Sequence, residues 1–198
     1  MAYELIAIGT SLGGLSALKT LLGYLPKEFP AALAVVQHRH RESDEVLSSF
    51  LQQFTLLPVH EVEDKEQIQP GNVYFAPADY HLLVESGYFS LSIDEPVSYA
   101  RPSIDVLFES TADAYAERAI GVLLTGANQD GVQGLSILKA RGGMTIVQDP
   151  DTAESPTLPN AAIANVAVDL ILPLSQIAPQ LIQLCTSAGG YSCKPSLQ

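Results

Sequence analysis

The sequence contains no tryptophan and only two cysteines among its 198 residues, Cys185 and Cys193, both near the C-terminal end. Two cysteines are too few for the disulfide framework of a small secreted domain, and no group of Cys and His has the spacing of a zinc site. We therefore expect both thiols to stay reduced, as they do in the cytoplasm.

Basic residues are also scarce, since 10 Lys and Arg stand against 22 Asp and Glu, for a formal net charge of −12. A nucleic-acid interface needs clustered Lys and Arg, and here they are spread along the chain, which excludes nucleic acid as a partner. No apolar run approaches the roughly 20 residues that cross a bilayer. The N-terminus lacks the basic start and apolar stretch of a signal peptide. These absences predict a cytoplasmic protein that is not itself embedded in a membrane.

Aliphatic residues make up for the lack of aromatics, because 47% of the residues are hydrophobic and only 7% aromatic. Short apolar segments indicate buried strands, and segments with apolar residues at helical spacing indicate helices between them. Such an order predicts a doubly wound α/β domain, a mostly parallel sheet with helices on both faces. The expected strands are 3–9, 31–37, 119–126, 144–148 and 169–173, and the expected helices are 15–25, 43–54, 101–119, 131–143, 159–165 and 175–184.

Residues 57–95 interrupt this alternation. Four short apolar segments in this stretch are separated by Pro-Gly, Asp and Ser-Gly signals, which indicates strands joined by tight turns. We interpret them as a small antiparallel addition beside the main sheet. Residues 187–198 are rich in Ser and Gly and are expected to form a flexible tail, which leaves one domain over residues 1–186.

Three polar residues follow strands of the predicted sheet. Ser11 follows the first strand, His38 follows the second, and Asp130 stands in the loop after the strand at 119–126. Ligands of open parallel sheets bind at the carboxyl ends of the strands. A serine nucleophile needs a base to take its proton, and the base needs a carboxylate to hold its tautomer. The three residues are therefore candidates for a catalytic set.

The segment 6–14, IAIGTSLGG, could be a nucleophile elbow, an anion-binding loop or a plain strand-to-helix connection. A dinucleotide-binding loop would have glycine in place of Ser11 and an acidic residue after the second strand, which instead ends in Gln37 and His38. The pattern Gly-x-Ser-x-Gly matches a nucleophile elbow, a sharp turn that exposes a hydroxyl at a helix N-terminus. An anion-binding loop and a plain strand-to-helix connection stay open.

Each candidate also has a simpler explanation. His38 could be an ordinary residue at a strand end, and Asp130 could only cap the helix that begins near Gly131. His38 and His40 could ligate a metal, but no nearby carboxylate or cysteine completes such a site. His81 could be a packing or rim residue.

Several short motifs occur in a characteristic order: IGTSLGG at 8–14, VQH at 36–38, PG at 70–71, APADYH at 76–81, RPSIDVLF at 101–108, LTG at 124–126 and DG at 130–131. Together they resemble the catalytic domain of the chemotaxis protein-glutamate methylesterases, over residues 3–184. The resemblance implies hydrolysis of glutamate γ-methyl esters on the cytoplasmic helices of a chemoreceptor, with release of methanol. Some members of that family also deamidate receptor glutamines. No metal or organic cofactor is implied.

The resemblance also assigns roles to residues of this chain. Ser11 would be the nucleophile, His38 the general base and then acid, and Asp130 the carboxylate that orients it. Backbone N–H groups of Leu12 and Ala127 would hold the oxyanion. His81, inside one of the motifs, is expected near the same edge of the sheet, with its role open.

The sequence departs from the family pattern in two places. The family usually reads Gly-Met-Gly-x-Asp-Gly where residues 126–131 read GANQDG. Ala127 lacks the bulky side chain, and Asn128 replaces a glycine, although Asn tolerates a left-handed backbone better than most residues. This loop keeps an alternative open, a binding or regulatory module of the same fold with weakened catalysis. Members of the family also carry a phosphorylatable receiver domain before the catalytic domain, and this sequence begins at the first catalytic strand.

Overall fold

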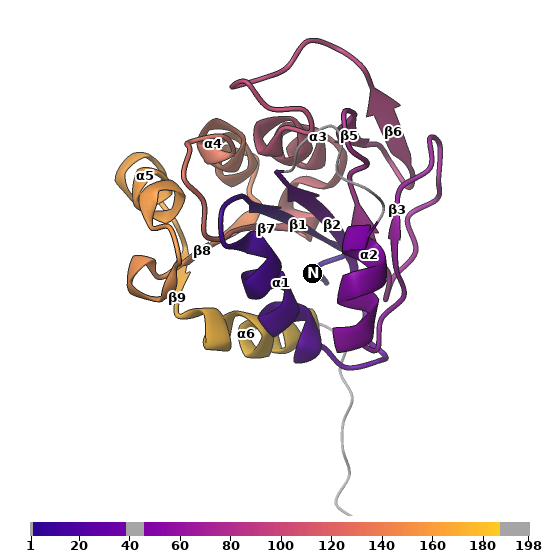
Figure 1. The fold of residues 1–198 in the computed structure, drawn as a ribbon, viewed down its shortest axis with the longest axis horizontal. Helices are drawn as coiled ribbons and strands as arrows, with labels where there is room; N and C mark the ends of the chain where they lie inside the picture. The colour runs from indigo at the N-terminus through magenta and orange to yellow at the C-terminus, as the bar shows by residue number, and fades with distance from the viewer. Residues whose placement is uncertain (1, 39–45, 187–198) are drawn as a thin grey trace, which may run out of the picture.

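The computed structural model describes residues 2–38 and 46–186. Their strands form a parallel sheet with the order β3-β4-β2-β1-β7-β8-β9 and a separate antiparallel pair, β5 His81–Val84 and β6 Phe89–Ser92 (Figure 1). The expected tail at 187–198 and the start of the helix expected at 43–54 lie outside the described residues. The strands of the large sheet are β1 Leu5–Thr10, β2 Ala32–Gln37, β3 Val59–Glu61, β4 Val73–Phe75, β7 Ala119–Leu123, β8 Met144–Gln148 and β9 Leu170–Leu172.

Helices cover both faces of this sheet (Figure 1). Successive side chains of a strand point to opposite faces, and β1 is buried along its whole length. Leu5 and Ala7 join the core under α3, α4 and α5, whereas Ile6 and Ile8 join the core under α1, α2 and α6. The fold class expected from the sequence is therefore confirmed. The helices are α1 Gly14–Gly23, α2 Val46–Leu51, α3 Ile104–Tyr115, α4 Val132–Ala140, α5 Thr157–Asn165 and α6 Leu174–Thr186, with 3₁₀ turns η1 Gln52–Phe54, η2 Ala116–Arg118 and η3 Pro150–Thr152.

The interpretation of residues 57–95 as one antiparallel addition is wrong for its first half. Strands β3 and β4 pair in parallel with each other, and β4 pairs in parallel with β2. Only β5, His81–Val84, and β6, Phe89–Ser92, form an antiparallel hairpin. All three residues of β4 are buried, which is typical of a strand covered on both faces, whereas tight turns join only antiparallel neighbours.

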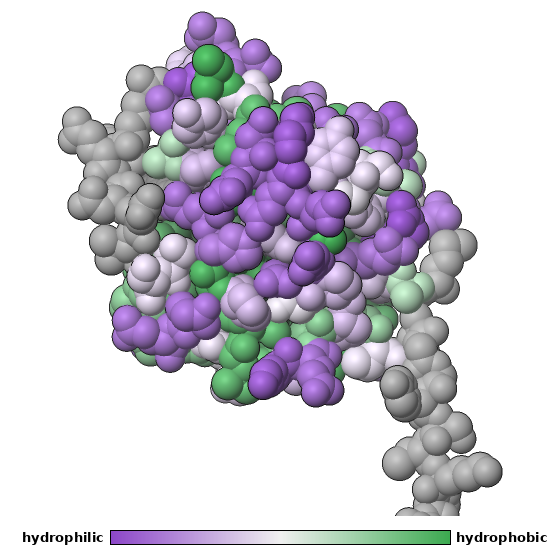
Figure 2. All heavy atoms as spheres, turned by 90° about the vertical axis from the view of Figure 1, so that its right-hand side faces the viewer, coloured by the Kyte–Doolittle hydropathy of each residue, from purple (hydrophilic) through white to green (hydrophobic). Residues whose placement is uncertain are grey.

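The β3 edge of the sheet ends in a hydrophilic surface. Figure 2 shows mainly hydrophilic side chains on this side of the molecule, with small hydrophobic groups between them. A short edge strand among polar side chains disfavours pairing with a further strand. No helix in the described part of the chain is long and apolar enough to span a membrane.

The chain reverses its direction of growth between β1 and β7. From β1 it builds outward through β2 and then returns to place β7 on the other side of β1. Ligands of open α/β sheets bind at such a switch point, outside the carboxyl ends of the strands. The fold therefore predicts a ligand site at the loops after β1, β2 and β7.

Candidate active site

The loops after β1, β2 and β7 are tied to one another by backbone hydrogen bonds. The N–H of Ser11 donates to the carbonyl of Thr125 at 3.0 Å, and the N–H of His38 donates to the carbonyl of Thr10 at 3.0 Å. These two bonds continue the parallel ladder past the ends of the strands. They bring the serine and histidine loops to one edge of the sheet, as the sequence predicts.

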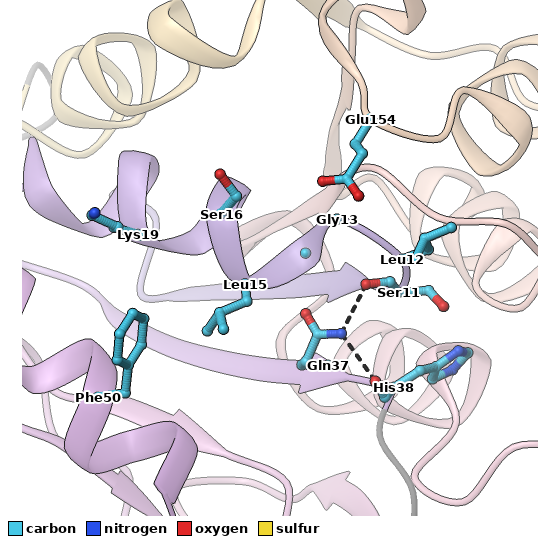
Figure 3. Close-up of a pocket in the computed structure, with 11 residues that line it drawn as sticks. Ser11, Leu12, Gly13, Leu15, Ser16, Lys19, Gln37, His38, Phe50 and Glu154 are labelled. Atoms are coloured by element: carbon cyan, nitrogen blue, oxygen red, sulfur yellow. Dashed lines mark hydrogen bonds between the residues drawn. The ribbon is translucent and has the colours of Figure 1, made fainter.

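A glutamine links the serine loop to the histidine loop. The amide nitrogen of Gln37 donates to the carbonyls of Ser11 at 2.8 Å and His38 at 3.0 Å (Figure 3). This contact requires glycine at position 14, because a Cβ there would lie 2.0 Å from Oε1 of Gln37. Gly13, with φ of 81°, makes the turn into α1. Sequence reasoning missed the role of Gln37, although a polar residue at the end of an apolar strand is a usable signal.

The imidazole of His38 is bound to a buried carboxylate. Nε2 of His38 lies 2.7 Å from Oδ2 of Asp130, whose side chain is fully buried. The N-terminus of α3 supplies further donors to this carboxylate: Ser103 Oγ at 2.7 Å, Ile104 N at 2.7 Å and Asp105 N at 3.1 Å. Burial alone would raise the pKa of Asp130, but the hydrogen bonds from His38, Ile104 and Ser103 outweigh it and hold the pKa below its ordinary value. Asp130 is therefore ionised.

The idea that Asp130 only caps the helix that follows it is wrong. Asp130 accepts hydrogen bonds from the first residues of α3, and the first turn of α4 is served by Asp105 instead. Oδ1 of Asp105 accepts the N–H groups of Gly131 at 2.9 Å and Gly134 at 2.7 Å. The two helices thus exchange their carboxylates. Asp105 and Ser103 were not singled out by the sequence, although a serine before an apolar run is a helix N-cap signal.

This exchange places Asp105 in surroundings that disfavour its ionised form. Burial is the main cause that raises its pKa to about 6, the charge of Asp130 adds to it, and the N–H groups of Gly134 and Gly131 oppose it. The folded protein holds a proton on Asp105 more tightly than the unfolded chain does. The contribution of Asp105 to the free energy of unfolding therefore falls as pH rises from about 4 to above 6.

Asp105→Asn is therefore expected to stabilise the protein more at about pH 8 than at about pH 4.5. The amide never ionises, its oxygen can keep both N–H donors, and its nitrogen can donate to Asp130. The difference should reach about 2 kcal/mol, since one pKa unit corresponds to about 1.4 kcal/mol. Urea unfolding of both proteins at both pH values measures it. A gain that is equal at the two pH values would contradict the assignment.

Two backbone N–H groups near Ser11 have no acceptor in the part of the chain that the structure describes. Among the described residues, neither Leu12 N nor Ala127 N donates to a protein acceptor, whereas Gly126 N donates to the carbonyl of Ser155 at 3.1 Å. The hydroxyl of Thr125 donates to the carbonyl of Leu12 at 2.9 Å and holds this part of the loop. Two free donors beside a candidate nucleophile are what an oxyanion hole requires.

Ser11 and His38 line the same open cavity of about 710 Å³, which runs along the start of α1 (Figure 3). Leu12 and Leu15 are exposed beside it. Its size is that of many small-molecule sites. Within residues 2–38 and 46–186, no group of three His, Cys, Asp or Glu is placed to hold a metal ion, and His40 lies outside those residues.

Not every expected contact is formed. Among the described residues, the hydroxyl of Ser11 makes no hydrogen bond to His38, and Nδ1 of His38 lies 2.8 Å from Nδ2 of Asn128 instead. Asn128 does not adopt a left-handed backbone, so replacing the family's glycine at this position causes no backbone strain of that kind. His81 is buried behind the N-terminus of α3, where its Nδ1 accepts the N–H of Ser103 at 3.3 Å and its Nε2 donates to the carbonyl of Glu95 at 3.1 Å. It does not line the cavity.

A doubly wound sheet with a serine loop, a histidine and a buried carboxylate at its strand ends is the arrangement typical of serine hydrolases of carboxylic esters or amides. The chain belongs to the CheB methylesterase family, whose model matches residues 6–181. The family and the enzyme class that the sequence predicts are thereby confirmed.

Relatives of two lengths are similar to this chain. A protein from Leptospira interrogans serogroup Icterohaemorrhagiae serovar copenhageni, named putative protein-glutamate methylesterase/protein-glutamine glutaminase, is 47% identical over 93% of this chain and 96% of its own length. A Burkholderia lata protein named protein-glutamate methylesterase/protein-glutamine glutaminase 2 is 42% identical over 92% of this chain. That alignment covers 54% of the Burkholderia protein, so the chain spans about half of it.

A solved structure has the same fold. The crystal structure of the Thermotoga maritima CheB methylesterase catalytic domain superposes with a TM-score of 0.89 and 34% identity, over 93% of this chain and all of that one. The chain therefore corresponds to a catalytic domain of the family.

Proposed function

We propose that this chain hydrolyses the γ-methyl ester of glutamate residues on the cytoplasmic helices of a chemoreceptor, and that Ser11, His38 and Asp130 carry out the reaction. The observation that supports this most strongly is the 2.7 Å contact between His38 and the buried Asp130, in a protein of this family whose cavity is lined by both His38 and Ser11. The reaction takes place in the cytoplasm, where those receptor helices lie.

The reaction begins at Ser11. Its oxygen attacks the ester carbonyl, and its proton passes to Nδ1 of His38, the ring nitrogen that Asp130 does not bind. The carbonyl oxygen becomes an oxyanion and accepts the free N–H groups of Leu12 and Ala127. Such donors are worth about 3 to 4 kcal/mol each in related reactions. The positive end of the α1 dipole faces the same place.

The tetrahedral intermediate collapses when the C–O bond to the methoxy group breaks. His38 returns its proton to that oxygen, methanol leaves, and the glutamyl group remains as an ester of Ser11. Water then attacks this acyl-enzyme with His38 again as base, which frees Ser11 and yields the glutamate carboxylate. Asp130 stays ionised and stabilises the imidazolium in both steps. The chain and water supply every group, so no cofactor is assigned a step.

A glutamine side chain can enter the same sequence. Its carbonyl would meet the same nucleophile and the same two donors, and ammonia would leave in place of methanol. The names of the two relatives include a protein-glutamine glutaminase activity. We therefore extend the proposal to deamidation of receptor glutamines, with Leu12 and Leu15 as apolar contacts for the receptor helix.

The proposal is tested by incubating the protein with a chemoreceptor cytoplasmic fragment that carries radiolabelled methyl esters. We expect release of labelled methanol and, in parallel, covalent labelling by a fluorophosphonate that maps to the peptide containing Ser11. Binding to the receptor fragment without methanol and without labelling would instead support the alternative of a regulatory module with weakened catalysis.

A further inference from the structure

Both ring nitrogens of His38 are engaged in this structure. Nε2 faces the ionised carboxylate of Asp130, so it carries the hydrogen and donates. Nδ1 faces the amide nitrogen of Asn128 at 2.8 Å. An amide nitrogen only donates, so Nδ1 is the acceptor in this contact, and its lone pair is directed at Asn128.

That lone pair is the group on which the proposed reaction depends. The hydroxyl of Ser11 can transfer its proton only to an imidazole nitrogen that is free to accept it, and Asp130 holds the other nitrogen. One lone pair accepts one well-directed hydrogen bond, so Asn128 and Ser11 compete for Nδ1. In this structure Asn128 holds it.

We propose that Asn128 is a positioning residue that holds His38 in a resting arrangement, and that its amide must leave Nδ1 before Ser11 can become a nucleophile. The inference rests on the proposed function, because only that reaction requires Nδ1. It makes the exchange between Asn128 and Ser11 a step that precedes attack on the ester.

Among the described residues, the side-chain amide of Asn128 makes one hydrogen bond, from its nitrogen to Nδ1 of His38. Its oxygen, Oδ1, is buried and has no hydrogen-bond partner in that part of the chain. A buried carbonyl oxygen without a donor is unfavourable. Loss of the bond to His38 is therefore partly offset when the oxygen gains a partner elsewhere, so the side chain can be displaced.

There is room for the displaced side chain. A second open cavity of about 660 Å³ is lined by Asn128 itself, together with Asp130, Tyr99, Ser136 and Asn165. The hydroxyl of Ser136 and the second N–H of the Asn165 amide, whose nitrogen already donates to the carbonyl of Ala161 at 2.7 Å, are donors that the orphan oxygen lacks in the resting arrangement. Asn128 thus contacts His38, which lines the cavity of the proposed substrate, and itself lines the second cavity.

The first test compares how fast a fluorophosphonate labels Ser11 in the wild-type protein and in Asn128→Ala. Removing the competitor should speed labelling by about 3- to 10-fold, the range of one hydrogen bond between neutral groups. Gln129→Ala, an exposed neighbour on the same loop, is the matched control and should label at the wild-type rate. Labelling of a folded Asn128→Ala that is equal to or slower than wild type would overturn the proposal.

The second test needs no variant and no activity. In wild-type protein labelled with ¹⁵N, a scalar coupling across the hydrogen bond should connect the side-chain nitrogen of Asn128 with an unprotonated Nδ1 of His38. Absence of this coupling, or a protonated Nδ1, would overturn the resting arrangement whatever the enzyme does. If the coupling is present and neither protein is labelled at Ser11, the proposed function fails instead, and the exchange fails with it.

Discussion

Methylated receptor incubated with Ser11→Ala is expected to release almost no methanol. The loss should be on the order of 10⁶-fold, because removal of a serine nucleophile abolishes the covalent route and leaves only binding and the oxyanion donors. The free energy of unfolding should stay near the wild-type value, since the hydroxyl of Ser11 makes no hydrogen bond among the described residues and leaves no partner unsatisfied. Labelled methanol and urea unfolding measure the two quantities.

This separation of activity from stability distinguishes a nucleophile from a structural serine. Ser175→Ala, at an exposed position of α6, is the control and should change neither quantity. A Ser11→Ala protein that still released methanol at the wild-type rate would remove Ser11 from the mechanism and leave the family assignment intact.

Asp130→Asn is expected to lower methanol release by about 10⁴-fold, the effect of replacing the orienting carboxylate in a serine protease. The amide can neither favour the required tautomer of His38 as the carboxylate does nor stabilise the imidazolium. It should also destabilise the fold, because the two carboxylate oxygens accept from His38, Ser103, Ile104 and Asp105 and an NH₂ group cannot accept. At least one buried donor loses its partner, at a cost of about 1 to 3 kcal/mol.

Asp169→Asn provides a matched control for that stability loss. Asp169 is also a carboxylate with several donors, Lys139 and both the N–H and the hydroxyl of Thr145, and these bonds outweigh burial to hold its pKa below the ordinary value. It lies beside β8 and β9, away from the cavity of Ser11. This variant should lose stability and keep its activity. Equal losses of activity in the two variants would mean that Asp130 acts through stability alone.

The sequence by itself determined the main features of the domain. The alternation of short aliphatic strands with amphipathic helices is a local pattern, so the sequence alone predicts a doubly wound sheet. Parallel strands then place the residues that follow them at one edge, which is why Ser11, His38 and Asp130 could be selected together. The resemblance supplied the family, which the comparisons confirm.

The parallel pairing of β3 and β4 could not be predicted from the sequence. Their three-residue lengths carry little periodicity, and the same short segments suit a hairpin or a parallel edge. The partners of each strand depend on which buried strand already stands beside it, and for β4 that neighbour is β2. Pairing of this kind is decided by the packing of the whole sheet.

The partners of the site residues were likewise decided only by the tertiary structure. The crossing of α3 and α4 is so close that a Cβ on Gly134 would lie 2.6 Å from the carbonyl oxygen of Asp105, and this proximity lets Asp130 and Asp105 each serve the other's helix. The contact of Asn128 with His38 arises where loops from distant parts of the chain meet. Sequence patterns report which face of an element is buried, whereas a hydrogen bond between two loops depends on where both elements are finally packed.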